Sequence, residues 1–128
     1  MEIKEWNLYT KEEKKEILRH WWYYYGKLLI SFEEIEEFNK LLDTNIEDIY
    51  VAALMSYLEG LSSQVLIYAM REGRVEEFFK ILPNFKDDEK LKDAFNAISR
   101  DFLNEVVGTL NNPEPSIPMS NEEIIRQL

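Results

Sequence analysis

The sequence contains no cysteine among its 128 residues. This absence excludes disulfide bonds, thiolate zinc sites, iron–sulfur clusters and cysteine nucleophiles. It also matches the cysteine usage of the cytoplasm, where thiols are kept reduced and disulfides are rare. We therefore expect a cytoplasmic protein.

Histidine is almost absent as well, because His20 is the only one. A di-iron helical bundle needs two Glu-x-x-His pairs, which one histidine cannot supply. A serine hydrolase triad would have to use Ser62 or Ser63, but no Gly-x-Ser-x-Gly elbow is present. We expect His20 to pair with Glu16, one helical turn earlier, and we predict that the protein is not an enzyme.

Basic residues are few: 15 Lys and Arg stand against 25 Asp and Glu, for a net charge of -10. Binding nucleic acid requires Lys and Arg to replace the counterions of the phosphates, so direct nucleic-acid binding is not expected. Residues 49–70 weakly resemble a helix-turn-helix. Its second helix, however, would present apolar side chains in place of those that read base edges.

Long hydrophobic runs are missing too. No stretch approaches the roughly 20 apolar residues of a membrane span, and the charged start Met1–Glu5 has no apolar segment behind it. We predict neither a membrane span nor a secretory leader. The period-two alternation of a half-buried strand is also absent, which argues against a sheet.

What the sequence does contain is the apolar spacing of helices. Four pairs match a capping box, in which Ser or Thr is followed three residues later by Glu: Thr10/Glu13, Ser31/Glu34, Thr44/Glu47 and Ser120/Glu123. The first pair opens a long amphipathic helix. Its predicted inward face is Ile17, Leu18, Trp21, Tyr25, Leu28, Leu29 and Phe32.

Further helices are predicted over residues 32–42, 45–59, 64–72, 75–82 and about 88–110. The segments 45–59 and 64–72 are apolar nearly all round, which is typical of buried helices, so we place both at the centre. We expect the side chains of Trp6, Leu8 and Tyr9 to pack against the helical bundle. The fold class is therefore all-α: a single compact bundle of five or six helices with a Pro-rich C-terminal tail.

Proline is concentrated in one place, with three of the four prolines between residues 113 and 118. Such a segment favours an extended, polyproline-like conformation. The short helix expected after it is too short to be stable alone in water. We therefore divide the chain into a helical domain (1–112) and a Pro-rich linker with a short amphipathic segment (113–128). That segment either docks on the body, docks on another copy or is loose.

The largest apolar area lies in the aromatic run from Trp21 to Tyr25. Trp21 and Tyr25 belong to the predicted inward face, and Trp22 borders it. Trp22, Tyr23 and Tyr24 cannot all point the same way on a helix, so one or two of them must lie at the surface. Because Tyr and Trp are favoured at protein interfaces, Tyr23 or Tyr24 is a candidate contact residue.

Acidic residues cluster between positions 33 and 48, where seven carboxylates accompany one Lys. They are Glu33, Glu34, Glu36, Glu37, Asp43, Glu47 and Asp48. The region around Asp43 lacks the glycine and the terminal glutamate of a calcium loop, so no metal site is expected. The cluster is either a solvated helix face or a negative surface that occupies the basic groove of a partner protein.

These observations favour a small acidic protein-interaction module without cofactors. An inhibitor, antitoxin or immunity-type protein is one concrete form, and its partner would have a basic surface. The candidate partner-binding residues are Glu33, Glu34, Glu36, Glu37, Tyr23 and Tyr24. The alternative is an assembly subunit that forms a homo-oligomer through the aromatic helix and the tail. An enzyme that uses carboxylates and tyrosine alone ranks third, because it needs two carboxylates whose pKa values are pushed apart.

Overall fold

The computed structural model describes residues 1–26, 31–59, 64–82 and 88–112. Over these ranges the chain is helical and contains no strand, which confirms the predicted all-α bundle. A 3-10 turn, η1 (Trp6–Leu8), precedes α1 (Lys11–Gly26), α2 (Phe32–Thr44), α3 (Ile46–Leu58), α4 (Gln64–Arg71), α5 (Val75–Ile81) and α6 (Glu89–Asn111). The predicted tail, 113–128, lies outside the described residues.

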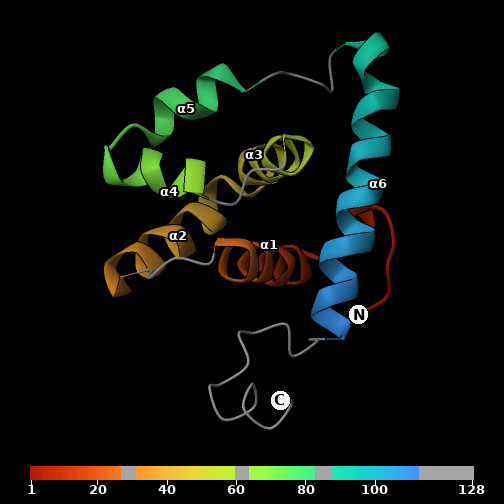
Figure 1. The fold of residues 1–128 in the computed structure, drawn as a ribbon, viewed down its shortest axis with the longest axis horizontal. Coiled ribbons are helices and arrows are strands. Elements are labelled where there is room, and N and C mark those ends of the chain that lie inside the picture. The colour runs from red at the N-terminus through yellow and green to blue at the C-terminus, as the bar shows by residue number, and fades with distance from the viewer. Residues whose placement is uncertain (27–30, 60–63, 83–87, 113–128) are drawn as a thin grey trace, which may run out of the picture.

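The centre of the bundle is α3, as its apolar composition predicted. It contacts α1, α2 and α6, which surround it in Figure 1. The buried residues of α3 are Ile49, Tyr50, Ala52, Ala53, Leu54 and Ser56. A helix with three neighbours buries most of its circumference, which explains why α3 has no polar face.

The prediction that α4 is also central is wrong. Leu66, Ile67 and Met70 face the core, but Tyr68 is 66% exposed on the opposite side. In Figure 1, α4 and α5 form a hairpin at the edge of the bundle. Only one face of α4 therefore meets the core, and composition alone does not reveal how many neighbours a short helix has.

The first capping box is confirmed at the start of α1. The N–H of Glu13 donates to Thr10 Oγ1 at 3.2 Å, and the N–H of Thr10 donates to Glu13 Oε1 at 3.0 Å. Trp21 and Trp22 are both buried, and Trp22 stacks on Phe38 of α2 with ring centroids 4.1 Å apart. Trp22 is thus a core residue, although the sequence placed it only at the border of the inward face.

Phe32 is not on that inward face, contrary to the prediction, and is 73% exposed. The reason is a break in the helix. Because α1 ends at Gly26 and Phe32 begins α2, the periodicity that joins Phe32 to Trp21 has no structural meaning. Ser31 instead caps α2, accepting from the N–H of Glu34 at 3.2 Å, as the second capping box predicted.

The third capping box, Thr44 with Glu47, does not form. A single residue, Asn45, separates α2 from α3, so Thr44 is still the last residue of α2. Its hydroxyl donates back to the carbonyl of Lys40 at 3.3 Å. The carboxylate of Glu47 is instead bound by Trp6 and Lys14, which are described below.

The N-terminal segment runs alongside α6 (Figure 1). Trp6 and Tyr9 are buried as predicted, whereas Leu8 is exposed. The Trp6 ring stacks on Tyr50 of α3 at a centroid distance of 3.8 Å. The Tyr9 hydroxyl donates to the carbonyl of Glu2 at 2.8 Å and accepts from the N–H of Lys4 at 3.0 Å. These contacts fix the segment as a wall of the bundle.

The helix α6 is buried over only part of its length. Phe102, Leu103, Val106 and Val107 are core residues, while Leu91 near the start of the helix is exposed. The three- and four-residue spacing in the sequence predicts an inward stripe of Leu91, Phe95, Ile98, Phe102, Val106 and Leu110. This stripe is confirmed at Phe102 and Val106. It is wrong at Leu91, because the first turns of α6 extend beyond α3, against which the helix packs (Figure 1).

Candidate partner-binding surface

The seven clustered carboxylates have two different environments. Three of them, Glu34, Asp43 and Glu47, bind side chains from other helices or the N-terminal segment. Glu33, Glu36, Glu37 and Asp48 are exposed and have no ion-pair partner among the described residues. The structure thus divides a cluster that is uniform in the sequence.

Glu34 joins α2 to α4. Its Oε1 accepts from Nη2 of Arg71 at 3.1 Å and from the hydroxyl of Ser31 at 3.1 Å. The Glu34 side chain is only 14% exposed, whereas that of Arg71 is half exposed. Of the predicted partner-binding glutamates, Glu34 is therefore the one already engaged within the chain.

Glu47 holds the N-terminal segment to α3. Its two carboxylate oxygens accept from Nε1 of Trp6 at 2.9 Å and from Nζ of Lys14 at 3.0 Å. The Lys14 ammonium also lies 5.0 Å from the centroid of the Trp6 ring, a cation–π distance. One carboxylate thus organises an indole and an ammonium from two other parts of the chain.

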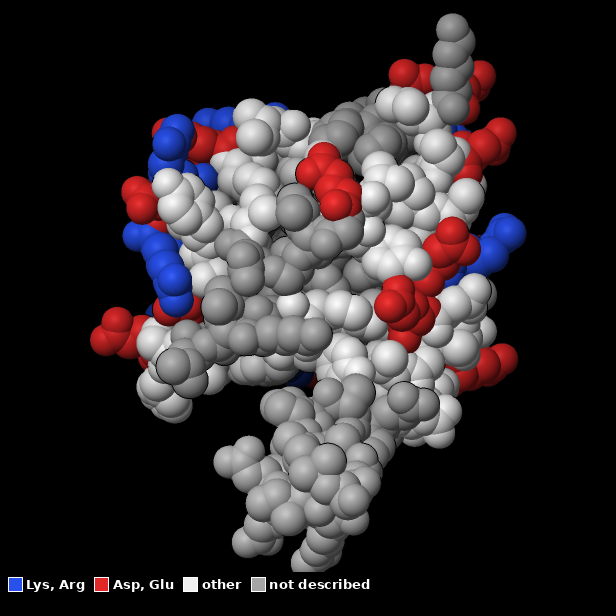
Figure 2. Space-filling model, in the orientation of Figure 1, with Lys and Arg blue, Asp and Glu red and all other residues white. Residues whose placement is uncertain are grey.

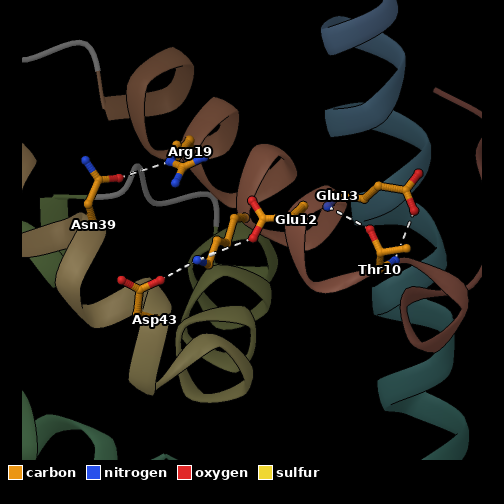
Figure 3. A network of polar contacts seen from close by, with 7 residues as sticks. Thr10, Glu12, Glu13, Arg19, Asn39 and Asp43 are labelled. Carbon is orange, nitrogen blue, oxygen red and sulfur yellow. Dashed lines mark hydrogen bonds and ion pairs between the residues drawn. The ribbon is translucent and has the colours of Figure 1, made fainter.

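Two polar links set the register of α1 against α2 (Figure 3). Nζ of Lys15 binds Asp43, and Nε of Arg19 donates to Oδ1 of Asn39 at 2.9 Å. The hydrogen bond between Lys15 and Asp43 raises the pKa of the lysine and lowers the pKa of the aspartate. From the first link to the second, the residue number rises by four in α1 (Lys15 to Arg19) and falls by four in α2 (Asp43 to Asn39). The two helices therefore run antiparallel.

Tyr23 is 43% exposed, which makes it the most exposed ring of the aromatic run in the described part of the chain. Tyr23 is in the last turn of α1, nine residues before Phe32, the first residue of α2. The exposed acidic side of α2 consists of Glu33, Glu36 and Glu37, which share one side of the helix by their i, i+3 and i+4 spacing.

Tyr24 lies on a different side of α1. Its ring stacks on His20 at a centroid distance of 5.0 Å, and Nε2 of His20 lies 2.9 Å from Oγ1 of Thr109 in α6. The Thr109 hydroxyl donates to the carbonyl of Val106, so Nε2 of His20 is the donor to its oxygen. The predicted pairing of His20 with Glu16 is wrong, because α6 packs beside α1 and supplies an acceptor.

The candidate surface is therefore formed by Glu33, Glu36, Glu37 and Tyr23. We call it the α2 acidic face. Glu34 is paired with Arg71 of α4, and Tyr24 stacks on His20, which is itself hydrogen-bonded to Thr109 of α6. Sequence periodicity separates the faces of one helix but does not say which neighbour covers each face.

A second feature was not anticipated from the sequence. A cavity of about 530 Å³ lies between the N-terminal segment and α6. Lys4, Lys92 and Arg100 are among its lining residues, and Glu5 is its one acidic residue. The spacing of Lys92, Asn96 and Arg100 by four residues was a usable signal, but the opposite wall comes from residues 3–7, about 90 positions away.

In the described ranges, no group of three or more His, Asp or Glu side chains is arranged to hold a metal ion. No helix in these ranges is long and apolar enough to cross a membrane. The chain matches no protein-family model, no curated protein and no solved structure.

Proposed function

We propose that this protein is a small acidic protein-binding module whose contact surface is the α2 acidic face. The observation that carries the proposal is the division of the carboxylates. Glu34, Asp43 and Glu47 form ion pairs with Lys or Arg side chains of other helices. Glu33, Glu36 and Glu37 remain exposed on one side of α2, and Tyr23, in the last turn of the preceding helix, is exposed as well.

Such a surface fits a partner with a basic groove or patch. Exposed carboxylates accelerate encounter with a cationic partner and select against acidic ones. Tyr23 supplies a large and fairly rigid apolar contact at the edge of the charged area, the role in which tyrosine is enriched at interfaces. An inhibitor, antitoxin or immunity-type protein would use its surface in this way.

Affinity capture from native lysate tests the proposal. The baits are the wild type, the variant Glu33→Lys/Glu36→Lys/Glu37→Lys, and a matched control, Glu76→Lys/Asp93→Lys/Asp101→Lys. Both variants reverse three exposed acids, but the control changes α5 and α6. We expect one protein to be retained by the wild type and the control and lost by the α2 variant.

Tyr23→Ala tests the apolar part of the same surface. We expect weaker capture of that same protein, with at least a tenfold loss of affinity if Tyr23 is a central contact, which corresponds to about 1.4 kcal/mol. Equal capture of every protein by all baits would contradict the proposed surface.

The alternative, an assembly subunit, is favoured by a surface other than the predicted aromatic helix and tail. An apolar groove of about 250 Å³ lies between α4 and α5, lined in part by Val65, Phe78, Tyr68 and Ile81. Ile81 is 76% exposed. Residues 64–82 carry three acidic and three basic side chains, so this hairpin is neutral in a chain of net charge -10. Figure 2 shows Lys and Arg at the upper left, over α4 and α5.

A second copy of the chain is the occupant that this groove suits, because the neutral rim avoids the repulsion that two acidic surfaces would cause.

Sedimentation velocity over a range of concentrations tests whether the chain dimerises through this groove. We expect Tyr68→Asp/Ile81→Asp to abolish any dimer. The matched control Leu8→Asp/Phe32→Asp changes exposed apolar residues elsewhere and should leave the dimer intact. A wild type that stays monomeric at about 1 mM, the dissociation constant of a very weak complex, excludes this alternative.

A further inference from the structure

The cavity between the N-terminal segment and α6 has two preformed walls. The first wall, residues 3–7, is held by the stack of Trp6 on Tyr50 and by the hydrogen bond from Trp6 to Glu47. The second wall is one side of α6, on which Lys92, Asn96, Ser99 and Leu103 follow one another at helical spacing. A cavity of about 530 Å³ lies within the range of roughly 300–1,000 Å³ for small-molecule sites.

The base of the cavity is ordered by internal contacts. Ser99 is nearly buried, and its hydroxyl is hydrogen-bonded to the hydroxyl of Tyr50. Burial raises the pKa of the Tyr50 phenol, which therefore stays protonated and able to donate. Trp6 and Leu103 are buried and close the cavity toward the core. Binding a ligand here therefore requires little reordering of the protein.

The charge of the lining is opposite to that of the molecule. Lys4, Lys92 and Arg100 line the cavity with a single carboxylate, Glu5, in a chain of net charge -10. Lys4 lies over the Tyr9 ring at 5.1 Å. Lys92 and Arg100 form no ion pair with any residue of the described ranges, whereas Lys14, Lys15, Arg71 and Arg74 all do.

Lys92 and Arg100 flank Asn96, each one helical turn away from it. Their Cα atoms are about 12 Å apart along the helix at 1.5 Å per residue, a distance that two long side chains span from both ends. An anionic group above Asn96 would therefore receive two charged donors and an amide. Ile3 on the first wall and Phe95 on the second wall provide apolar lining.

We propose that this cavity binds a small organic anion, a carboxylate or phosphate ester with an apolar part. The anionic group binds Lys92 and Arg100, and the apolar part lies between Ile3 and Phe95. This site is on α6 and the N-terminal segment, so it is independent of the α2 acidic face. Loss of either site by mutation leaves the other available for measurement.

The aromatic sulfonate 8-anilinonaphthalene-1-sulfonate is a suitable probe, because it combines an anionic group with apolar rings. Its fluorescence increases when it moves from water into an apolar site. We expect saturable binding to the wild type and at least tenfold weaker binding to Lys92→Glu/Arg100→Glu. The matched control Lys40→Glu/Lys80→Glu, on α2 and α5, makes the same change in net charge and should stay within twofold of the wild type. Circular dichroism spectra should show that both variants are folded.

Two measurements locate the probe and identify the charge contribution. In an NMR titration, the side-chain amide signals of Asn7, Asn96 and Asn104 should shift, because these residues line the cavity. The uncharged analogue N-phenyl-1-naphthylamine should bind the wild type and the Lys92→Glu/Arg100→Glu variant within twofold of each other. Arg100→Lys should retain most of the affinity for the sulfonate.

Three results would overturn the proposal. The first is the absence of saturable binding by the wild type. The second is an equal loss of affinity in the cavity variant and in the charge-matched control, which would reduce the effect to net charge. The third is a set of NMR shifts confined to the α4–α5 groove around Val65 and Tyr68, which would place the probe in the other apolar depression of the surface.

Discussion

At the residue scale, Glu47 and Asp48 show how neighbours in the sequence acquire different roles. Both lie in the first turn of α3, where carboxylates interact favourably with the helix dipole. Glu47 faces the N-terminal segment and binds Trp6 and Lys14, while Asp48 faces solvent. The difference arises because only one side of this turn is covered by another segment.

We predict that Glu47→Ala lowers the free energy of unfolding by about 1–3 kcal/mol, because the buried indole N–H of Trp6 loses its acceptor. Glu47→Gln should cost less, since the amide oxygen still accepts from Trp6 and only the pairing with Lys14 is lost. The control Asp48→Ala should change stability by no more than about 0.5 kcal/mol. Urea denaturation of the three variants measures these differences, and equal effects at both positions would contradict the assigned role.

His20 gives a second prediction at this scale. Burial lowers the pKa of His20, so the folded state binds a proton more weakly than the unfolded chain does. Stability is therefore complete above the unfolded pKa of about 6.5 and falls as the pH decreases through and below that value. The carboxylates whose pKa values are lowered, Glu13 and Asp43, add to the loss only in the acidic range of carboxyl titration.

We expect thermal denaturation to show a decreasing melting temperature between pH 7.5 and pH 5.5 in the wild type. His20→Gln keeps an N–H donor for Thr109 but does not titrate, so its melting temperature should be nearly constant over that window. Because His20 is the only histidine, a slope that persists in the variant would show that another group is responsible.

At the element scale, the junction between α4 and α5 shows how a helix ends with its carbonyls satisfied. Gly73 has a positive φ of 65°. Its N–H donates to the carbonyl of Met70 at 3.1 Å, and the N–H of Arg74 donates to the carbonyl of Ala69 at 2.9 Å. This pair of hydrogen bonds is the Schellman motif, and it turns the chain so that α5 packs back against α4.

Substitution by alanine should change the stability of the protein in opposite directions at Gly73 and at Gly108. Gly73→Ala forces a side chain into the left-handed region and should destabilise the protein by about 1–2 kcal/mol. Gly108 lies inside α6, where an added Cβ would meet nothing within 4 Å. Gly108→Ala should therefore stabilise by roughly 0.5–1 kcal/mol. Chemical denaturation of both variants tests the assignment, and a shared sign would refute it.

At the scale of the whole molecule, the excess negative charge is distributed over the surface. Asp and Glu follow the right edge of Figure 2, along α6, whereas Lys and Arg balance the acids within residues 1–26 and within the α4–α5 hairpin. Some of the few basic residues are already paired with acids within the chain, as in Lys14–Glu47 and Arg71–Glu34. Like-charge repulsion among the remaining acids opposes the compact state.

We therefore predict that added salt stabilises the folded chain. Raising NaCl from about 0.01 M to about 0.15 M shortens the Debye length from about 30 Å to about 8 Å, which screens repulsion between distant acids. Exposed ion pairs contribute little in return. Scanning calorimetry should show a higher melting temperature in the higher salt, and a decrease would mean that the internal pairs outweigh the repulsion.

The sequence alone determined the features that depend on neighbours within one or two helical turns. These are the helical fold class, the caps at Thr10 and Ser31, and the buried central helix α3, because hydrogen bonding at a helix start and apolar periodicity are local. For the candidate site, the same local reasoning selected Glu33, Glu36, Glu37 and Tyr23, each of which is exposed. It included Glu34 and Tyr24 with them, although Glu34 is paired with Arg71 of α4 and Tyr24 stacks on His20.

Only the tertiary structure decided which surfaces meet. The partner of Glu34 is 37 residues away, that of Glu47 is 41 residues away, and that of His20 is 89 residues away. The exposure of Phe32 and Tyr68 and the cavity beside α6 depend in the same way on helix ends and on packing neighbours. A contact between distant segments is set by the geometry of the whole bundle, and the spacing of residues within one helix carries no information about it.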